Sequence, residues 1–234
     1  MRTTTLDYTD GDINLQGYIA YPDRENAPAV LIAPAWAGRD EFVCKKAREI
    51  AELGYIGFAI DMYGDARIGK SVEENSSLMS PFMENRTLLR QRITAAFTAL
   101  LQQPGIDSNR IGAMGFCFGG LCALDLARSG ADIKGVVSFH GLLQAPTGMP
   151  LETIKAKMLI LHGYDDPMAK PNQLIEFADS MSAANVDWQI HAYSQTQHAF
   201  TNPQAHDDKL GLIYNARTAK RAWVSMQNFF AEVL

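Results

Sequence analysis

Along the chain, short runs of apolar residues alternate with longer segments in which apolar residues recur at helical spacing. The apolar runs are typical of strands buried on both faces, and they lie at Ala29–Ala33, Ile56–Ile60, Ile111–Phe116, Gly135–Phe139, Met158–His162 and Trp188–Tyr193. The segments of helical spacing lie at Asp40–Leu53, Arg86–Gln102, Gly119–Ala127, Asn172–Ala184 and Ile213–Val233. Buried strands that alternate with helices predict an α/β fold, with a mostly parallel central sheet and helices on both of its faces.

The N-terminal segment follows a different pattern. Thr3–Tyr8 and Ile13–Tyr21 alternate apolar with polar residues on either side of the turn-forming pair Asp10-Gly11, which predicts an antiparallel hairpin. The segment Asp61–Met83 is the least regular and indicates only a short helix near Ser71–Ser76; it forms either a lid or a passive connection. No internal repeat, low-complexity tract or linker divides the chain, so residues 1–234 are expected to form one domain.

Composition narrows the classes of function. Apolar residues make up 47% of the 234 residues and charged residues 20%, as in a globular chain rather than a disordered one. The net charge of −5 argues against a nucleic-acid partner, because phosphates require a basic surface. Three cysteines, an odd and low number, favour a reducing compartment over a disulfide framework. Since no apolar segment is long enough for a signal peptide or a membrane span, we expect a cytoplasmic protein without a membrane partner.

The most informative motif is Gly115-Phe116-Cys117-Phe118-Gly119-Gly120, which follows one predicted strand and opens a predicted helix. It matches the G-x-S-x-G nucleophile elbow, a strand–turn–helix motif, with cysteine in place of serine. The glycines allow neighbouring backbones to approach closely, and a helix N-terminus favours a thiolate at Cys117. The backbone N–H of Phe118 is placed to bind an oxyanion. Alternatively, Cys117 is a small buried hydrophobic residue, which is the usual role of a free cysteine.

A cysteine nucleophile needs a histidine base, and the order of residues along the chain favours His198. In α/β-hydrolases the histidine follows the nucleophile and the acid, and His198 lies in the loop after the last predicted strand. His191 lies inside that strand and His162 ends another, so both have structural explanations. His206 is expected to be solvated. His140 ends a strand at the same edge of the sheet, where a pocket role and a structural role are both consistent with its position.

The acid is expected in the loop that precedes Pro167, where two carboxylates follow a predicted strand. Either Asp165 or Asp166 can orient the histidine, and either can instead cap a turn, so spacing alone does not separate them. Cys117, this acidic loop and His198 occur in the order of a catalytic triad, each after the carboxyl end of a predicted strand. Because open α/β sheets place their sites at that edge, the combination predicts a triad.

From about Gly17 to Leu234 the sequence resembles the dienelactone hydrolase family of α/β-hydrolases. The matching segments are Gly-Phe-Cys-Phe-Gly-Gly at 115–120, Ser-Phe-His-Gly at 138–141, Leu-His-Gly-Tyr-Asp-Asp-Pro at 161–167 and His-Ala-Phe-Thr-Asn-Pro at 198–203. The cysteine elbow is the most specific of these, since most α/β-hydrolases use serine. The resemblance implies an α/β-hydrolase fold and a Cys117–His198–Asp166 triad, with the acid just before the proline. It also implies an oxyanion hole formed by the backbone N–H groups of Phe118 and Trp36.

Two positions depart from the family pattern. Well-studied members carry a Glu that helps to activate the thiol where this chain has Ala35, and an Arg that binds the substrate carboxylate where it has Asn202. Glu41 is the nearby carboxylate that could take the place of the Glu. The arginines that could take the place of the Arg lie on one predicted helix and are Arg86, Arg90 and Arg92. The departures put the particular lactone substrate in doubt more than the hydrolase chemistry.

These observations predict a carboxylic ester hydrolase, similar to carboxymethylenebutenolidases, that cleaves a small ester, lactone or thioester through a covalent acyl-enzyme. This chemistry needs no cofactor and no metal. The expected partner is the small-molecule substrate, and the expected assembly is a monomer or a small homo-oligomer. An apolar substrate pocket is expected to be lined by Tyr63, Phe82, His140 and Phe200, although several of these residues are equally consistent with an ordinary core.

Two alternatives compete with the enzyme prediction. The chain is instead a binding or regulatory protein of the same fold if Ala35 leaves the thiol unactivated, because an unactivated thiol is nearly inert. A redox pair of Cys117 and Cys122 is disfavoured, because their spacing is not that of a C-x-x-C site.

Overall fold

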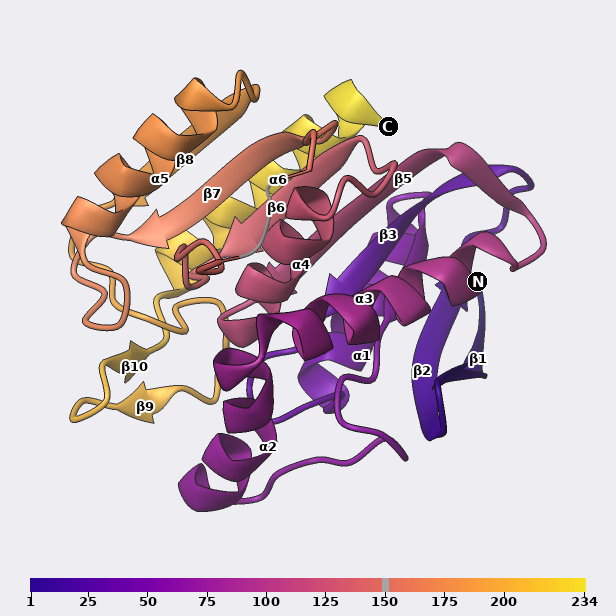
Figure 1. The fold of residues 1–234 in the computed structure, drawn as a ribbon, viewed down its shortest axis with the longest axis horizontal. Coiled ribbons are helices and arrows are strands. Elements are labelled where there is room, and N and C mark those ends of the chain that lie inside the picture. Colours follow the sequence, from indigo (N-terminus) through magenta and orange to yellow (C-terminus); the bar gives the residue numbers. More distant parts are fainter. Residues whose placement is uncertain (149–151) are drawn as a thin grey trace.

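The computed structural model describes residues 1–148 and 152–234, and its central element is an eight-stranded sheet covered by helices on both faces (Figure 1). The strand order is β1-β2-β4-β3-β5-β6-β7-β8. These strands are β1 (Arg2–Asp10), β2 (Ile13–Tyr21), β3 (Ala27–Ala33), β4 (Ile56–Ala59), β5 (Ile106–Phe116), β6 (Gly135–Phe139), β7 (Lys157–Gly163) and β8 (Trp188–Tyr193). The helices are α1 (Glu41–Glu52), α2 (Val72–Glu84), α3 (Arg86–Leu101), α4 (Phe118–Arg128), α5 (Pro171–Ala183) and α6 (Ala216–Val233).

The sheet is mostly parallel, as predicted. Strands β4, β3, β5, β6, β7 and β8 pair in parallel, whereas β1 pairs with β2 and β2 with β4 in antiparallel orientation. The N-terminal hairpin is therefore confirmed, and it extends one edge of the parallel sheet. Because all the parallel strands end at the same edge, the loops that follow β3, β5, β6, β7 and β8 converge there.

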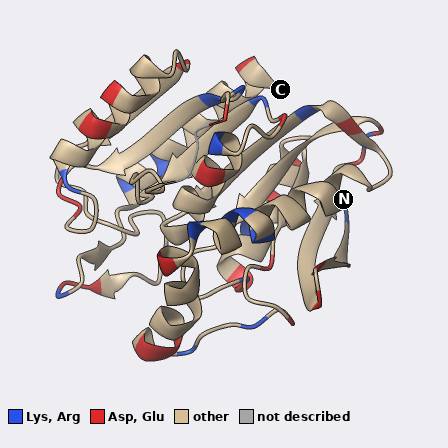
Figure 2. Cartoon of the chain, in the orientation of Figure 1, with Lys and Arg blue, Asp and Glu red and all other residues tan. Residues whose placement is uncertain are grey.

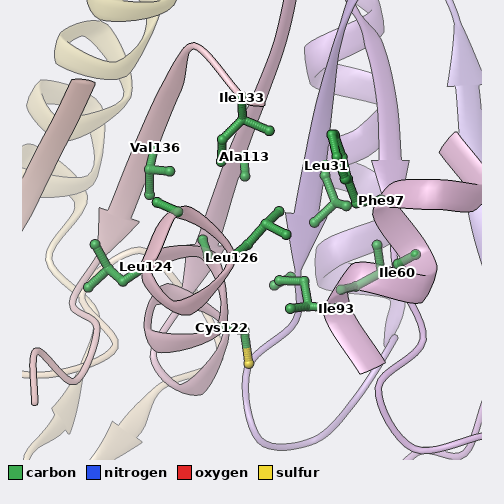
Figure 3. Packing of buried hydrophobic residues seen from close by; sticks show 14 of the residues in the cluster. Leu31, Ile60, Ile93, Phe97, Ala113, Cys122, Leu124, Leu126, Ile133 and Val136 are labelled. Carbon is green, nitrogen blue, oxygen red and sulfur yellow. The ribbon is translucent and has the colours of Figure 1, made fainter. Parts of the chain in front are cut away.

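Strand β3 shows how the apolar runs build the core. All seven of its residues are buried, because successive side chains point to opposite faces and both faces are covered. Leu31 joins the cluster beneath α3 and α4, where Ile93, Phe97 and Leu126 pack around it (Figure 3). Val30 joins the cluster on the opposite face, which α1 and α6 cover. The strand is apolar at every position because helices cover both of its faces.

The segment after β4 contains more helix than the sequence indicated. Helix α2 spans Val72–Glu84 in place of the short helix expected near Ser71–Ser76. The Ser71 side chain caps it by accepting from the Glu74 N–H, and Pro81 lies inside it. Only Phe82 of this helix is buried, so the apolar periodicity that reveals an amphipathic helix is weak here.

The C-terminal helix begins later than expected. Ile213 belongs to β10 (Leu212–Ile213), which pairs with β9 (His206–Asp207), and α6 begins only at Ala216. The side chain of Asn215 caps α6 by accepting from the Thr218 N–H. The two short strands form a hairpin at the end of the sheet toward which β6 and β7 point (Figure 1).

Charged residues of both signs are interspersed over the visible helices and loops (Figure 2). Within the ranges that the structure describes, no helix combines the length and the apolar character needed to cross a bilayer.

Candidate active site

The motif around Cys117 forms a tight turn between β5 and α4. Cys117 has a positive φ of 55° and a ψ of −118°, a strained conformation for a residue other than glycine. A Cβ at Gly115 would collide with the backbone of Gly119, and a Cβ at Gly119 would collide with the backbone of Ala33. Glycine is therefore required on both sides of the cysteine because neighbouring backbones lie too close for a side chain. This is the close approach that the motif predicts.

Cys117 lies at the N-terminal end of α4 and is only partly buried, whereas Cys44 and Cys122 are buried. Its backbone N–H donates to the Phe139 carbonyl at 3.0 Å, which ties the turn to β6. Phe118 is the first residue of the helix, so its N–H has no intrahelical acceptor and is available to an anion beside the sulfur.

The loops after β7 and β8 bring Asp166 and His198 together. His198 Nδ1 lies 2.7 Å from Asp166 Oδ2, and both side chains are fully buried. Asp166 Oδ1 accepts from the backbone N–H groups of Met168 and Ala169, at 2.8 and 3.2 Å, which fixes the carboxylate. Asp165 is exposed, so of the two carboxylates that spacing alone left open, it is Asp166 that contacts the histidine.

His198 is held in a strongly polarised environment. Burial acts to lower the pKa of its imidazole, but the charge of the Cys117 thiolate and the hydrogen bond to Asp166 outweigh burial and raise the pKa to about 10. Nε2, the nitrogen opposite the one that faces Asp166, is buried and has no hydrogen-bond partner among the described residues. His198 can therefore carry a proton and is poised to exchange it with a group in front of Nε2.

A cavity of about 280 Å³ opens onto Cys117 and His198. Its described lining is Ala35, Trp36, Ala37, Asp40, Phe42, Met79, Phe116, Cys117, His140, Leu142, Met168, His198, Ala199, Thr201, Asn202, Gln204, Ala205, His206, Asp207 and Leu212. The loop after β3 thus contributes one wall, and the loop after β8 together with the β9–β10 hairpin contributes another.

Of the four residues expected to line the pocket, His140 does so and the other three do not. Tyr63 packs parallel to Phe118 with 6.3 Å between ring centroids, and Phe82 packs against both rings. Phe200 is fully buried and lies edge to face with His140 and Tyr193. These aromatic side chains belong to the hydrophobic core that supports the cavity.

His140 combines a cavity position with a structural contact. Its Nε2 lies 2.8 Å from Thr201 Oγ1, and Thr201 also lines the cavity. Burial, helped by the neighbouring positive charge on His198, lowers the pKa of His140 well below its ordinary value. His140 is therefore a neutral ring beside the ionisable His198.

Trp36 is placed in the loop after β3 at the cavity wall, and this loop is anchored from behind. The Tyr63 hydroxyl donates to the Trp36 carbonyl at 2.8 Å. Gly38 has a φ of +91°, and its N–H donates to the Ala35 carbonyl at 3.0 Å to close the turn. The loop is thus held at the wall of the cavity onto which Cys117 opens.

The charges suggested as replacements for the family's Glu and Arg lie elsewhere. Glu41 is exposed and pairs with Arg48, so it does not face the cavity. The three arginines of α3 are engaged by Asp125, by the Arg128 carbonyl and by Asp10, and none of them lines the cavity. Each of these side chains is held by a partner that does not line the cavity.

Several cavity residues were not singled out from the sequence. Met79 comes from α2, Met168 from the loop after β7, and His206 and Asp207 from β9. The contribution of His206 and Asp207 depends on the β9–β10 hairpin, which the bond from the Ile213 N–H to the His198 carbonyl at 3.0 Å holds beside the site. Among the described residues, no group of three or more His, Cys, Asp or Glu side chains is arranged to hold a metal ion.

The other histidines have local roles. His162 Nε2 donates to the Ala169 carbonyl at 2.8 Å, and this bond braces the loop that carries Asp166. His191 Nδ1 lies 3.1 Å from Ser225 Oγ, so it links β8 to α6. His206 is exposed, as expected, but it stands at the rim of the cavity.

Comparison with known proteins places this site in a family context. The family model described as "Dienelactone hydrolase family" matches residues 15–234. A putative carboxymethylenebutenolidase of Aquifex aeolicus is 26% identical over 237 residues and covers 98% of both chains. A probable 2-oxo-3-(5-oxofuran-2-ylidene)propanoate lactonase of Bradyrhizobium sp is 28% identical over 212 residues, 85% of each chain.

Solved structures agree with the sequence relatives. The crystal structure of a dienelactone hydrolase-like promiscuous phosphotriesterase from metagenomic libraries superposes with a TM-score of 0.93. It is 33% identical in sequence, and the match covers 99% of this chain and 98% of that chain. An acylaminoacyl peptidase of Pyrococcus horikoshii, 14% identical, shares the fold alone with a TM-score of 0.75 over 42% of its length. The expected α/β-hydrolase fold is confirmed.

Proposed function

The chain belongs to the dienelactone hydrolase family, and from this premise we propose that it is a carboxylic ester hydrolase that uses a Cys117–His198–Asp166 triad. The observation that carries the proposal is the 2.7 Å contact between Asp166 and His198, beside a cysteine in a strained turn at a helix N-terminus. Small esters, lactones and thioesters are the substrate class, since all present an acyl carbonyl to the thiol.

In the first half of the reaction, the Cys117 sulfur attacks the acyl carbon. If the sulfur starts as a thiol, His198 Nε2 takes its proton; if it starts as a thiolate, the proton is already on the imidazole. The carbonyl electron pair moves onto oxygen, and the oxyanion is bound by the backbone N–H groups of Phe118 and Trp36. Collapse breaks the bond to the leaving group, which takes the proton from His198 and departs. The product on the enzyme is a thioester at Cys117.

In the second half, His198 accepts a proton from water as the water oxygen attacks the thioester carbonyl. The same two N–H groups bind the second oxyanion. Collapse then breaks the carbon–sulfur bond, releases the carboxylic acid and returns the proton to the Cys117–His198 pair. In both halves the role of Asp166 is to hold Nδ1 and stabilise the imidazolium, and no proton is transferred to it.

The test is hydrolysis of p-nitrophenyl acetate by the wild type and by Cys117→Ala. We expect turnover in the variant to fall to the background rate, with an unchanged circular dichroism spectrum. Cys122→Ala is the matched control, because Cys122 is buried in the core under α4 and does not line the cavity. Turnover retained in Cys117→Ala contradicts the proposal.

A His198→Asn variant provides a second readout. It lacks the base for deacylation, so mass spectrometry should detect one acetyl group on the peptide that contains Cys117. If instead Cys117 reacts with iodoacetamide no faster than a free cysteine, and no ester is hydrolysed, the chain is a binding protein of the same fold.

A second candidate activity is the hydrolysis of phosphotriesters. It is favoured by the likeness to a structure described as a promiscuous phosphotriesterase, which covers nearly the whole chain. The Cys117 sulfur would attack phosphorus in place of carbon, the phosphoryl oxygen would occupy the oxyanion site, and the bond to the leaving alcohol would break as that group takes a proton from His198. Water, with His198 as the base, would then cleave the phosphorus–sulfur bond and restore the thiol. Release of p-nitrophenol from paraoxon by the wild type, and its loss in Cys117→Ala, is the expected result.

A further inference from the structure

The wall of the catalytic cavity holds carboxylates, histidines and apolar side chains, but its described basic side chains do not include the long cationic ones. Among the lining residues that the structure describes there is neither lysine nor arginine, and the ionisable acids besides the triad's are Asp40 and Asp207. Most of the remaining wall is apolar, formed by residues such as Trp36, Phe42 and Leu142. An anion that enters this space therefore loses water without gaining an ion pair with lysine or arginine.

Asp207 is the stronger source of negative charge on the wall. Its Oδ1 accepts from the N–H groups of Lys209 and Leu210 at 3.0 and 3.1 Å, which orients the carboxylate on β9. These bonds use one oxygen only. Asp40 caps α1 by accepting from the Val43 N–H, and burial raises the pKa of its carboxyl. As a carboxylate, Asp40 repels an anion.

The catalytic groups do not compensate these acids. His198 Nδ1 lies 2.7 Å from Asp166 Oδ2, so the positive charge that a protonated His198 carries is already paired with that carboxylate. His140 stays neutral because burial lowers its pKa well below the ordinary value. Neither of these two histidines therefore offers an anion a positive charge that is not already paired.

The nearest groove that contains basic residues lies across the Phe42–Asn202 wall. It has a volume of about 600 Å³ and shares Phe42, Thr201, Asn202 and Gln204 with the cavity. Its basic residues are Lys45, Lys46 and Lys220. Lys46 is already engaged by Glu49 at 2.7 Å and by the face of Trp223. These lysines line the neighbouring groove and not the cavity that holds the sulfur.

We propose that the cavity selects uncharged substrates and rejects those that carry a carboxylate or another anion near the scissile bond. The expected difference in hydrolysis rates rests on the proposed hydrolase function. The expected difference in which molecules reach Cys117 depends on the cavity alone. The chain would then act on neutral esters or lactones, and the acidic lactones associated with relatives of the family would be poor substrates.

The first test measures charge selectivity without turnover. The Cys117 sulfur adds to the double bond of a maleimide, and the proton ends on the adjacent carbon, so no leaving group is involved. The rate ratio of 3-maleimidopropionamide to 3-maleimidopropionate is measured at Cys117 by mass spectrometry and compared with the ratio for N-acetylcysteine amide. We expect the ratio at Cys117 to be larger by about tenfold or more.

Asp207→Asn is the variant that isolates the wall charge, because the amide oxygen keeps the acceptor for Lys209 and Leu210. We expect it to reduce the ratio at Cys117 by about threefold. Asp179→Asn is the matched control, since Asp179 is exposed on α5 and does not line the cavity. A wild-type ratio equal to that of the free thiol overturns the proposal, and so does an equal effect of the two variants.

The second test uses hydrolysis of methyl 4-acetoxybenzoate and 4-acetoxybenzoate, which differ in one negative charge. Each kcat/KM is divided by the rate constant of that ester with hydroxide, and we expect the neutral ester to be favoured by about a hundredfold. Equal values overturn the charge selectivity and leave the hydrolase proposal standing. If neither ester is hydrolysed, the hydrolase proposal fails for this class, and the maleimide ratio still decides the charge selectivity.

Discussion

The imidazole rings of His140 and His198 meet edge to face, with their centroids 5.1 Å apart. One ring is kept neutral by burial, and the other has its pKa raised by the charges of Cys117 and Asp166 despite its own burial. The contact therefore places a rigid, uncharged surface against the ionisable one. Thr201 holds this surface from the other side through His140 Nε2 at 2.8 Å.

A double-mutant cycle at His140 and Thr201 tests how this support is built. Thr201→Val removes the hydroxyl while keeping the shape, and leaves His140 Nε2 buried without a partner. We expect a loss of about 1–3 kcal/mol in the free energy of unfolding. Adding His140→Phe should recover most of that loss, because both polar groups are then gone. Urea denaturation provides the values, and a double variant less stable than the Thr201→Val single variant contradicts the account.

Stability should fall in weak acid because of two buried histidines. Burial lowers the folded-state pKa of His140 and of His162, so each has a lower pKa folded than unfolded. The stability linked to this difference is fully present above the unfolded pKa of about 6.5 and is lost as pH falls toward the folded pKa. The slope is at most about 1.4 kcal/mol per pH unit for each histidine.

Urea midpoints between pH 7 and pH 5 measure this slope. His162→Gln removes one titrating group, so its slope should be smaller than that of the wild type. His191→Gln is the control, because His191 is only half-buried on β8. Equal slopes in all three proteins would show that the acid sensitivity arises elsewhere.

The fold was largely predictable because burial on two faces leaves a strong pattern in the sequence. Val30 and Leu31 pack in opposite clusters, so both must be apolar, and the run they belong to identifies a central strand. Helix α2 was underestimated since it buries little beyond Phe82. A helix that covers only the rim of a sheet lacks the periodicity that marks the others.

The candidate site was predictable where sequence order reflects topology. Asp166 and His198 follow adjacent parallel strands, so both reach the same sheet edge. Sequence order did not predict which aromatic residues line the cavity. Tyr63 and Phe82 lie in a loop and a helix, and from the sequence such positions are consistent with both the core and the cavity. Asp207 could not be placed from the sequence, because its position depends on the hairpin that returns over His198.

Asp166→Asn should weaken catalysis without unfolding the protein. The amide can still accept from the Met168 and Ala169 N–H groups, but the negative charge that stabilises the His198 imidazolium is lost. We expect kcat to fall by about a hundredfold or more. We also expect the pKa of His198 to decrease, since Asp166 is one of the groups that raise it.

The titration of His198 is followed by NMR in the wild type and the variant. Asp165→Asn is the matched control, because Asp165 is exposed and adjacent in sequence. A normal kcat in Asp166→Asn, or a His198 pKa that does not move, would remove Asp166 from the proposed triad.

Tyr63→Phe tests the anchor behind the loop after β3. The substitution removes the hydroxyl that donates to the Trp36 carbonyl and keeps the ring stacked on Phe118. If Trp36 supplies an oxyanion donor, a loosened loop should lower kcat by about three- to tenfold and change KM little. Tyr55→Phe, on the opposite face of the sheet, should leave both parameters unchanged. A Tyr63→Phe variant with wild-type kcat would show that the anchor does not position the donor.

The elbow glycines should tolerate no side chain, for a reason that differs from the usual flexibility of glycine. Gly119 lies inside helix α4, yet a Cβ there would collide with the Ala33 and Pro34 carbonyl groups of the neighbouring strand and loop. Because the colliding atoms are backbone, they cannot rotate away, and Gly119→Ala should cost more than about 4 kcal/mol or prevent folding. Gly105→Ala is the matched control, since Gly105 has a φ of +79° and nothing within 4 Å of an added Cβ. It should cost only about 1 kcal/mol for the left-handed conformation. Thermal unfolding of both variants decides the matter, and a Gly119→Ala protein as stable as Gly105→Ala would mean that the strand and the helix can separate without loss of the fold.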